Sequence, residues 1–134
     1  MKVAFTTQDA VTVDAHFGWC PKLAVYEVEL DGARLVAVHE FAPGAEDGDE
    51  DKLAPRLEAL AGAAVVYTTA IGQGAATRVR SLGVQAAKVA EGSSIEGLLG
   101  QLRQVMAGRP PPWLRKAMSG AGLRPFDPEE VPSP

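Results

Sequence analysis

Ala63-Ala64-Val65-Val66-Tyr67-Thr68-Thr69 is a continuous run of apolar and β-branched residues near the middle of the 134-residue chain. A run without polar alternation is typical of a strand that is covered on both faces, as in the parallel sheets of α/β proteins. A helical pattern of leucines over 53–61 precedes it, and Ile71-Gly72-Gln73-Gly74 follows it and turns the chain into a second short helix. We therefore expect this run to be a central strand.

Four more segments have strand patterns. Lys2–Thr6 and Val84–Val89 are short apolar runs that suit buried strands, whereas 23–30 alternates apolar and acidic residues, as a strand with one wet face does. Asp31-Gly32 separates 23–30 from the strand pattern over 34–41 and predicts a type I′ hairpin turn, which needs positive φ at both central positions. These two strands are therefore expected to be antiparallel neighbours.

The order of these segments predicts an α/β fold with three layers. Each helix–strand unit after residue 52 is a crossover that adds a parallel strand with a right-handed connection. The expected fold is a five-stranded mixed sheet flanked by helices, in which 23–30 is antiparallel. Across this sheet the strands run in the order 34–41, 23–30, 2–6, 63–69, 84–89.

Neighbouring strands 2–6 and 63–69 have connections that leave in opposite directions. The crevice at their carboxyl ends is the topological switch point, where ligands bind in open α/β sheets. Two loops are expected to meet there, Thr7–Cys20 and Ala70–Gly74.

The carboxy-terminal part of the sequence predicts one more helix, followed by a Pro-rich segment. Ser93-Ser94-Ile95-Glu96 matches a capping box built from Ser93 and Glu96, and the helix that follows ends at Gly108. Seven of the ten prolines lie beyond Gly108, which predicts that this part does not form core. We expect a domain over 1–108, a Pro-rich segment and short helix over 109–119, and a mobile tail over 120–134.

Composition excludes several classes of protein. The formal net charge of −4 argues against a nucleic-acid binder, and no apolar run approaches the roughly 20 residues that span a bilayer. The single cysteine cannot form an internal disulfide, so a reducing compartment, the cytoplasm, is expected. The acidic run over 46–51 lacks the spacing of a calcium loop and is interpreted as a solvated loop.

The segment Val13-Asp14-Ala15-His16-Phe17-Gly18-Trp19-Cys20 concentrates the chemistry of the chain. His16 and Cys20 can both bind a soft metal, although a lone cysteine is as often a small buried hydrophobe. One histidine and one cysteine are too few for a tetrahedral zinc site or a four-cysteine cluster. A metal at this loop would therefore arrive as a preassembled unit. His39 lies in a strand pattern and is interpreted as structural.

The turn Gly72–Thr77 offers a second kind of binding, because backbone N–H groups at a helix start attract an anion. Arg78 and Arg80 add positive charge nearby. This leaves open an anion- or nucleotide-binding regulator in which His16 is structural. A small hydrolase is disfavoured because His16 has no partner acid at a suitable spacing, and we expect no enzymatic activity.

Four segments carry a resemblance to a known family. They are Val13–Trp19, Glu50-Asp51-Lys52-Leu53-Ala54-Pro55, Ala70-Ile71-Gly72 and Pro110-Pro111-Pro112-Trp113-Leu114-Arg115-Lys116-Ala117. Together they resemble the dinitrogenase iron–molybdenum cofactor biosynthesis family over roughly residues 1–118. The His-Phe-Gly motif is shared across that family, and the Pro-rich ending is the more specific motif.

The resemblance implies a ribonuclease-H-like fold without nuclease activity. It also implies a carrier that transiently binds the iron–sulfur precursor of the iron–molybdenum cofactor, or the cofactor itself. The implied partners are the radical enzyme that makes the precursor, the cofactor-biosynthesis scaffold and apo-dinitrogenase, with no nucleic acid and no membrane. The implied cofactor contact is His16. The expected cofactor-binding residues are Asp14, His16, Phe17, Gly18, Gly72, Gly74 and Arg78, and the expected metal ligands are His16 and Cys20.

Overall fold

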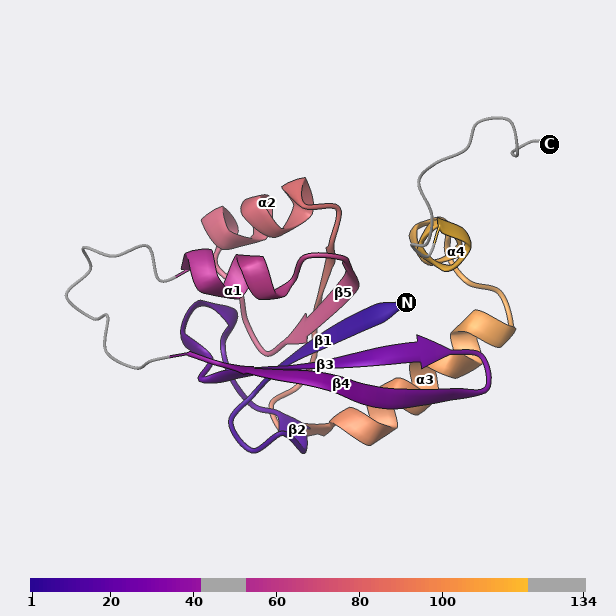
Figure 1. Ribbon diagram of the computed structural model, residues 1–134, viewed down its shortest axis with the longest axis horizontal. Coiled ribbons are helices and arrows are strands. Elements are labelled where there is room, and N and C mark those ends of the chain that lie inside the picture. Colours follow the sequence, from indigo (N-terminus) through magenta and orange to yellow (C-terminus); the bar gives the residue numbers. More distant parts are fainter. Residues whose placement is uncertain (42–52, 121–134) are drawn as a thin grey trace.

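The computed structural model describes residues 1–41 and 53–120 (Figure 1). The predictions for the acidic run 46–51 and for residues 121–134 fall outside these residues. Along the chain the elements are β1 (Lys2–Thr7), β2 (Thr12–Val13), the 3-10 turn η1 (Phe17–Trp19), β3 (Lys22–Glu29), β4 (Gly32–Glu40), α1 (Leu53–Ala59), β5 (Ala63–Thr68), α2 (Gln73–Ser81), β6 (Gln85–Lys88), β7 (Ser93–Ser94), α3 (Ile95–Ala107) and α4 (Pro112–Gly120).

Five of the strands form one mixed sheet in the order β4-β3-β1-β5-β6. The strand β1 lies at its centre, antiparallel to β3 and parallel to β5, and β6 continues the parallel half. The apolar run that begins at Ala63 is therefore an inner strand, as predicted, and the α/β class is confirmed. A second sheet of two short strands, β2 and β7, was not expected from the sequence.

Helices cover both faces of the large sheet (Figure 1). On one face α1 and α2 pack over a core that includes Leu23, Val66 and Val79. On the other face α3 packs over a separate core that includes Phe5, Val65 and Leu99. Alternate residues of β1 and β5 supply the two cores, because successive side chains of a strand point to opposite faces. None of the helices in the described ranges is long and apolar enough to cross a membrane.

The hairpin between β3 and β4 forms as predicted, but its turn differs from the expected type I′ turn. Glu29 pairs with Gly32, so Gly32 already belongs to β4, and neither Asp31 nor Gly32 has a positive φ. A turn without positive φ does not supply the twist of a type I′ turn. A register shift between the pairs of Val25 and Tyr26 introduces a bulge, and bulges increase the local twist of two strands.

The start of α3 differs from the predicted capping box in the residue that caps the helix. The hydroxyl of Ser94, not that of Ser93, accepts a hydrogen bond from the Gly97 N–H at 3.0 Å. Ser93 is occupied elsewhere, because it pairs with Val13 between β7 and β2 and its N–H donates to the Ala90 carbonyl. The strand pairing at Ser93 therefore moves the start of the helix by one residue.

The prediction that nothing beyond Gly108 forms core is wrong. The Pro-rich segment leads into α4, as expected, but Leu114 of this helix is only 1% exposed and joins the core under α3. Trp113 and Met118 pack against the same core. Pro110 and Pro111 restrict the backbone of the connection from α3, and the apolar contacts of Trp113, Leu114 and Met118 hold α4 against the domain.

Replacement of Leu114 by Ala tests whether α4 is docked in solution. We expect Leu114→Ala to lower the free energy of unfolding by about 3 kcal/mol, because it removes a fully buried side chain. The matched control is Val105→Ala on α3, where the side chain is 41% exposed and the loss should stay below about 0.5 kcal/mol. Urea unfolding followed by circular dichroism measures both. Equal losses in the two variants would contradict the docked position of α4.

Candidate functional site

The two loops that were expected to meet at the switch point do meet. They leave the carboxyl ends of β1 and β5, and the backbone carbonyl of Ala15 joins them. This one oxygen accepts hydrogen bonds from Thr6 Oγ1 (2.7 Å), Thr68 Oγ1 (3.2 Å) and the Thr69 N–H (3.3 Å). The Phe17 N–H then donates to the Ala70 carbonyl at 2.9 Å. The segment around His16 is therefore fixed to the ends of both central strands.

Asp9 and Asp14 shape the first half of this loop. The carboxylate of Asp9 accepts from the N–H groups of Val11 and Thr12, and these two hydrogen bonds lower the pKa of that carboxyl. They close a tight turn in which Ala10 has a φ of 66°. Asp14 Oδ1 accepts from the Gln8 N–H at 2.8 Å. Asp14, a predicted cofactor contact, thus already holds the loop through one of its oxygens.

His16 is presented by η1, the short 3-10 turn that follows it. Its Nδ1 accepts a hydrogen bond from the Gly18 N–H at 3.0 Å and so caps the turn. A neutral imidazole whose Nδ1 accepts carries its proton on Nε2. The geometry therefore leaves the proton on Nε2 of this half-buried ring, and Nε2 has no hydrogen bond within residues 1–41 and 53–120.

Gly18 and Trp19 enclose the His16 ring. A side chain at Gly18 would place its Cβ 3.4 Å from Cε1 and Nδ1 of the ring, which is close van der Waals contact. The indole of Trp19 lies parallel to the imidazole, with ring centroids 5.9 Å apart and planes 8° apart. Trp19 is 55% exposed, so the pair presents a flat aromatic surface at the loop.

The expected contact residue Phe17 has a different position. Its side chain is fully buried in the core under α1 and α2. The burial of a phenylalanine provides roughly 2 kcal/mol of stabilisation and anchors the turn. Phe17 therefore anchors the backbone next to His16 in the core, and its own side chain does not reach the surface.

Cys20 is also in this core, fully buried, with its Sγ donating to the Phe17 carbonyl at 3.6 Å. Burial raises the pKa of the thiol, although the Arg56 guanidinium acts against this. The metal-binding species is the thiolate, so this position opposes the role predicted for Cys20. The Cys20 thiol is thus enclosed in the core, whereas the His16 ring is only half-buried.

Arg56 is a buried residue that the sequence did not single out. Its Nε and Nη2 donate to the Cys20 carbonyl at 3.2 and 2.6 Å, and its guanidinium lies 4.6 Å from the centre of the Phe41 ring. It thereby ties α1 to the end of the His16 loop. The sequence pattern does not indicate this role, because a single arginine in a helix is usually exposed to solvent. The paired threonines at the ends of β1 and β5, Thr6-Thr7 and Thr68-Thr69, are a local pattern in the sequence that indicates where the loop is attached.

The second predicted element, the turn at the start of α2, lies directly after Ala70. Gly72 is the N-cap of α2 and no side chain caps the helix there. Gly72 and Gly74 are both exposed, and a Cβ at either would meet no atom within 4 Å. Arg78 is exposed on the same helix, one turn further along. Among residues 1–41 and 53–120 there is no group of three or more His, Cys, Asp or Glu side chains that could hold a metal ion.

The sequence matches the family model described as dinitrogenase iron–molybdenum cofactor over residues 1–105, which extend from β1 almost to the end of α3. The chain belongs to the dinitrogenase iron–molybdenum cofactor family. The recognition of this family from its motifs is confirmed. The site at the His16 loop is thus part of a dinitrogenase iron–molybdenum cofactor domain.

Two curated relatives cover nearly the whole chain. Protein NifX of Herbaspirillum seropedicae is 46% identical over 131 residues, which span 97% of this chain and 90% of that protein. Protein NifX of Azotobacter vinelandii is 38% identical over 130 residues, which span 95% of this chain and 82% of that protein. The similarity therefore continues past the family model into α4.

A solved structure, titled crystal structure of PH0822, is similar in fold. The TM-score is 0.58 with 25% sequence identity, and the match covers 78% of this chain and 91% of that chain. This neighbour supports the α/β fold class of the chain.

The buried position of Cys20 generates a prediction about stability and pH. Because the folded protein raises the pKa of this thiol, the thiol stabilises the fold below its usual pKa of 9.0, and this contribution falls as the pH rises above that value. We expect Cys20→Ala to lower the free energy of unfolding by about 1 kcal/mol at neutral pH. The difference from wild type should shrink above pH 9, as measured by urea unfolding across pH. A pH-independent difference would contradict the raised pKa.

Proposed function

We propose that this protein is a non-catalytic carrier in iron–molybdenum cofactor biosynthesis. Its cargo would be the iron–sulfur precursor cluster or the finished cofactor. It would take the cargo from the radical enzyme that makes the precursor and deliver it to the biosynthesis scaffold or to apo-dinitrogenase in the cytoplasm. Membership of the dinitrogenase iron–molybdenum cofactor family supports the pathway. The details of cargo and partners are our inference from the motif resemblance and from the His16 loop.

The position of His16 is the observation on which this proposal depends. The ring is half-buried, capped at Nδ1 by a backbone N–H and stacked on Trp19. Its loop is fixed to both central strands through the Ala15 carbonyl. A single, rigidly held imidazole suits the binding of one iron of a cargo whose other metal positions already have sulfide ligands. A single imidazole could not assemble such a cluster from free ions.

The hydrogen bond at Nδ1 makes the binding of iron to Nε2 of His16 less favourable. An imidazole that binds iron through Nε2 gives up the proton there, and in the neutral ring the proton then resides on Nδ1. Nδ1 would then be a donor facing the N–H of Gly18, which is also a donor. The turn must open, and the loss of one hydrogen bond costs about 1 kcal/mol. We infer that this cost keeps the binding reversible, as a carrier requires.

The start of α2 supports the same function from the other loop. The turn at Gly72 and Gly74 follows Ala70, whose carbonyl accepts from the Phe17 N–H. Free N–H groups at a helix start favour an anion, and an iron–sulfur cargo is anionic. We propose that this end of α2, with Arg78, contributes a weaker electrostatic contact. Because its N-cap has no side-chain hydrogen bond, a nucleotide or another anion is the second candidate ligand.

Anaerobic titration with the isolated iron–sulfur precursor tests the carrier proposal. We expect the wild-type protein to retain iron after gel filtration and to become brown, and His16→Ala to lose most of this iron. The matched control is His39→Ala, in the strand β4, which should retain wild-type levels. Cys20→Ala should also retain the cargo, because its thiol is buried.

Two results would oppose the carrier proposal. Equal iron in His16→Ala and wild type would remove the site assignment. No retained iron in wild type, together with a higher melting temperature in the presence of a nucleotide, would favour the anion-binding alternative at Gly72–Thr77.

Hydrogen exchange at the Gly18 amide tests the step at Nδ1. We expect this amide to exchange about fivefold or more faster in the loaded protein, because the loss of about 1 kcal/mol of hydrogen bonding exposes it. The amide of Leu99, in the middle of α3, is the internal control and should not change. Two-dimensional NMR of a diamagnetic cargo complex, or mass spectrometry of peptides around Gly18, measures the rate. Slower exchange at Gly18 would mean that Nε2–H donates to a sulfide and that the ring does not ligate iron.

A further inference from the structure

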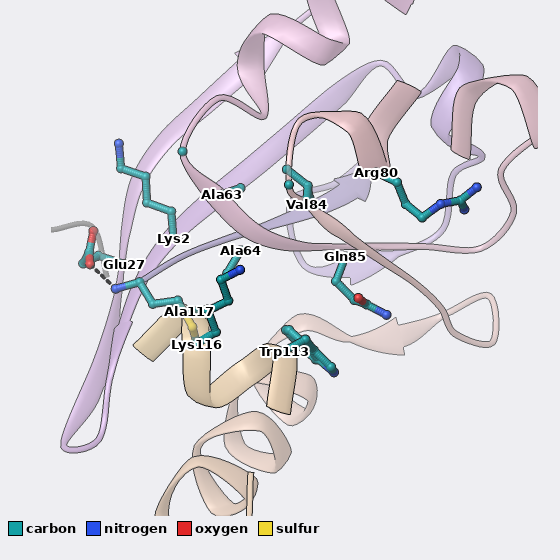
Figure 2. A pocket seen from close by; sticks show the side chains of 13 residues that line it. Lys2, Glu27, Ala63, Ala64, Arg80, Val84, Gln85, Trp113, Lys116 and Ala117 are labelled. Carbon is teal, nitrogen blue, oxygen red and sulfur yellow. Dashed lines mark hydrogen bonds and ion pairs between the residues drawn. The ribbon is translucent and has the colours of Figure 1, made fainter. Parts of the chain in front are cut away.

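A groove of about 820 Å³ lies at the end of the sheet opposite to His16. Its floor is formed by the amino ends of the parallel strands, with Lys2 of β1, Ala64 of β5 and Gln85 of β6. The helix α4 forms one wall, and Figure 2 shows Trp113 of this helix facing Gln85 across the groove. The proposed carrier function does not use this end of the molecule.

Positive charge is spread along the groove. Lys2, Lys116 and Arg80 line it from three different elements, β1, α4 and α2, and all three are exposed. Within the described part of the chain, none of the three cationic side-chain groups has an ion pair or a hydrogen bond. Figure 2 shows Lys2 and Arg80 toward opposite ends, with Lys116 between them. Among the described residues that line the groove, Glu27 is the only one with a carboxylate, and it already pairs with the Met1 amino group at 2.6 Å.

Residues of α4 face two different environments, the core and the groove. Leu114 points into the core, whereas Trp113, Lys116 and Ala117 line the groove, at the i, i+3 and i+4 spacing of one helix face. Arg115 is exposed and does not line the groove. The motif that most specifically marked the carboxy-terminal part of the sequence thus builds a surface remote from the cargo loop.

We propose that this groove binds an extended acidic segment of a partner protein. The local positive charge contrasts with the net charge of −4 of the whole chain, so an acidic partner would be directed to this end. Cations from three elements match carboxylates spaced along a polypeptide better than one compact phosphate group. The half-buried indole of Trp113 adds a place for an apolar side chain between the acidic residues.

Binding of a labelled acidic peptide to the full-length protein tests this proposal. The probe is a fluorescein-labelled peptide in which Glu alternates with Leu and Ser, and fluorescence anisotropy measures its dissociation constant. We expect Lys116→Glu and Lys2→Glu each to weaken binding about fivefold, because each converts an attraction into a repulsion. The matched control is Arg115→Glu, which makes the same charge change on α4 outside the groove and should weaken binding by less than about twofold.

Three outcomes would overturn the proposal. The first is equal weakening by Lys116→Glu and Arg115→Glu, which would indicate only general charge attraction. The second is preference for a single-stranded oligonucleotide of equal charge over the peptide, which would make a nucleic acid the occupant. The third is tighter peptide binding after the combined changes Asp127→Asn, Glu129→Gln and Glu130→Gln, which would make the acidic end of this chain the occupant. Retained iron in Lys116→Glu keeps this test separate from that of the cargo site.

Discussion

The carbonyl oxygen of Ala15 is the point on which the arrangement of the site depends. It accepts three hydrogen bonds, from the hydroxyls of Thr6 and Thr68 and from the Thr69 N–H. These donors come from the ends of two parallel neighbours, β1 and β5, so the loop conformation requires that both strands are paired. The position of His16, the next residue, is therefore a consequence of the sheet itself. Loops fixed by a rigid scaffold in this manner are where binding residues concentrate.

Much of the fold could be predicted because its signals are local. The apolar run at 63–69, the alternation over 23–30 and the Asp31-Gly32 turn region indicated strands and a hairpin, and the structure contains them. The errors came from interactions between distant residues. Pairing of Ser93 with Val13 moved the helix cap to Ser94, and burial of Leu114 brought a Pro-rich segment into the core. Neither contact leaves a local signal.

The site could be predicted only as far as its place in the topology. The sequence brought the loops of His16 and Gly72 together at the switch point, and the Phe17–Ala70 hydrogen bond joins these loops. The sequence could not show which side chains of the His16 loop face solvent. Only the three residues of the 3-10 turn separate His16 from Cys20, yet the side chain of His16 is half-exposed and that of Cys20 lies in the core. Side-chain direction within an irregular loop follows from packing, which a residue pattern does not encode.

The chain has two tryptophans, and the fold separates them. Trp19 stacks on His16 at the carboxyl end of the parallel strands, and Trp113 lines the groove at the amino end. Each indole therefore gives an optical signal that belongs to one end of the sheet. Iron–sulfur clusters absorb light in the range where indole emits, so a cluster would quench its nearer neighbour more strongly. Fluorescence of the two single-tryptophan forms can thus follow events at either end in real time, without a label attached to the protein.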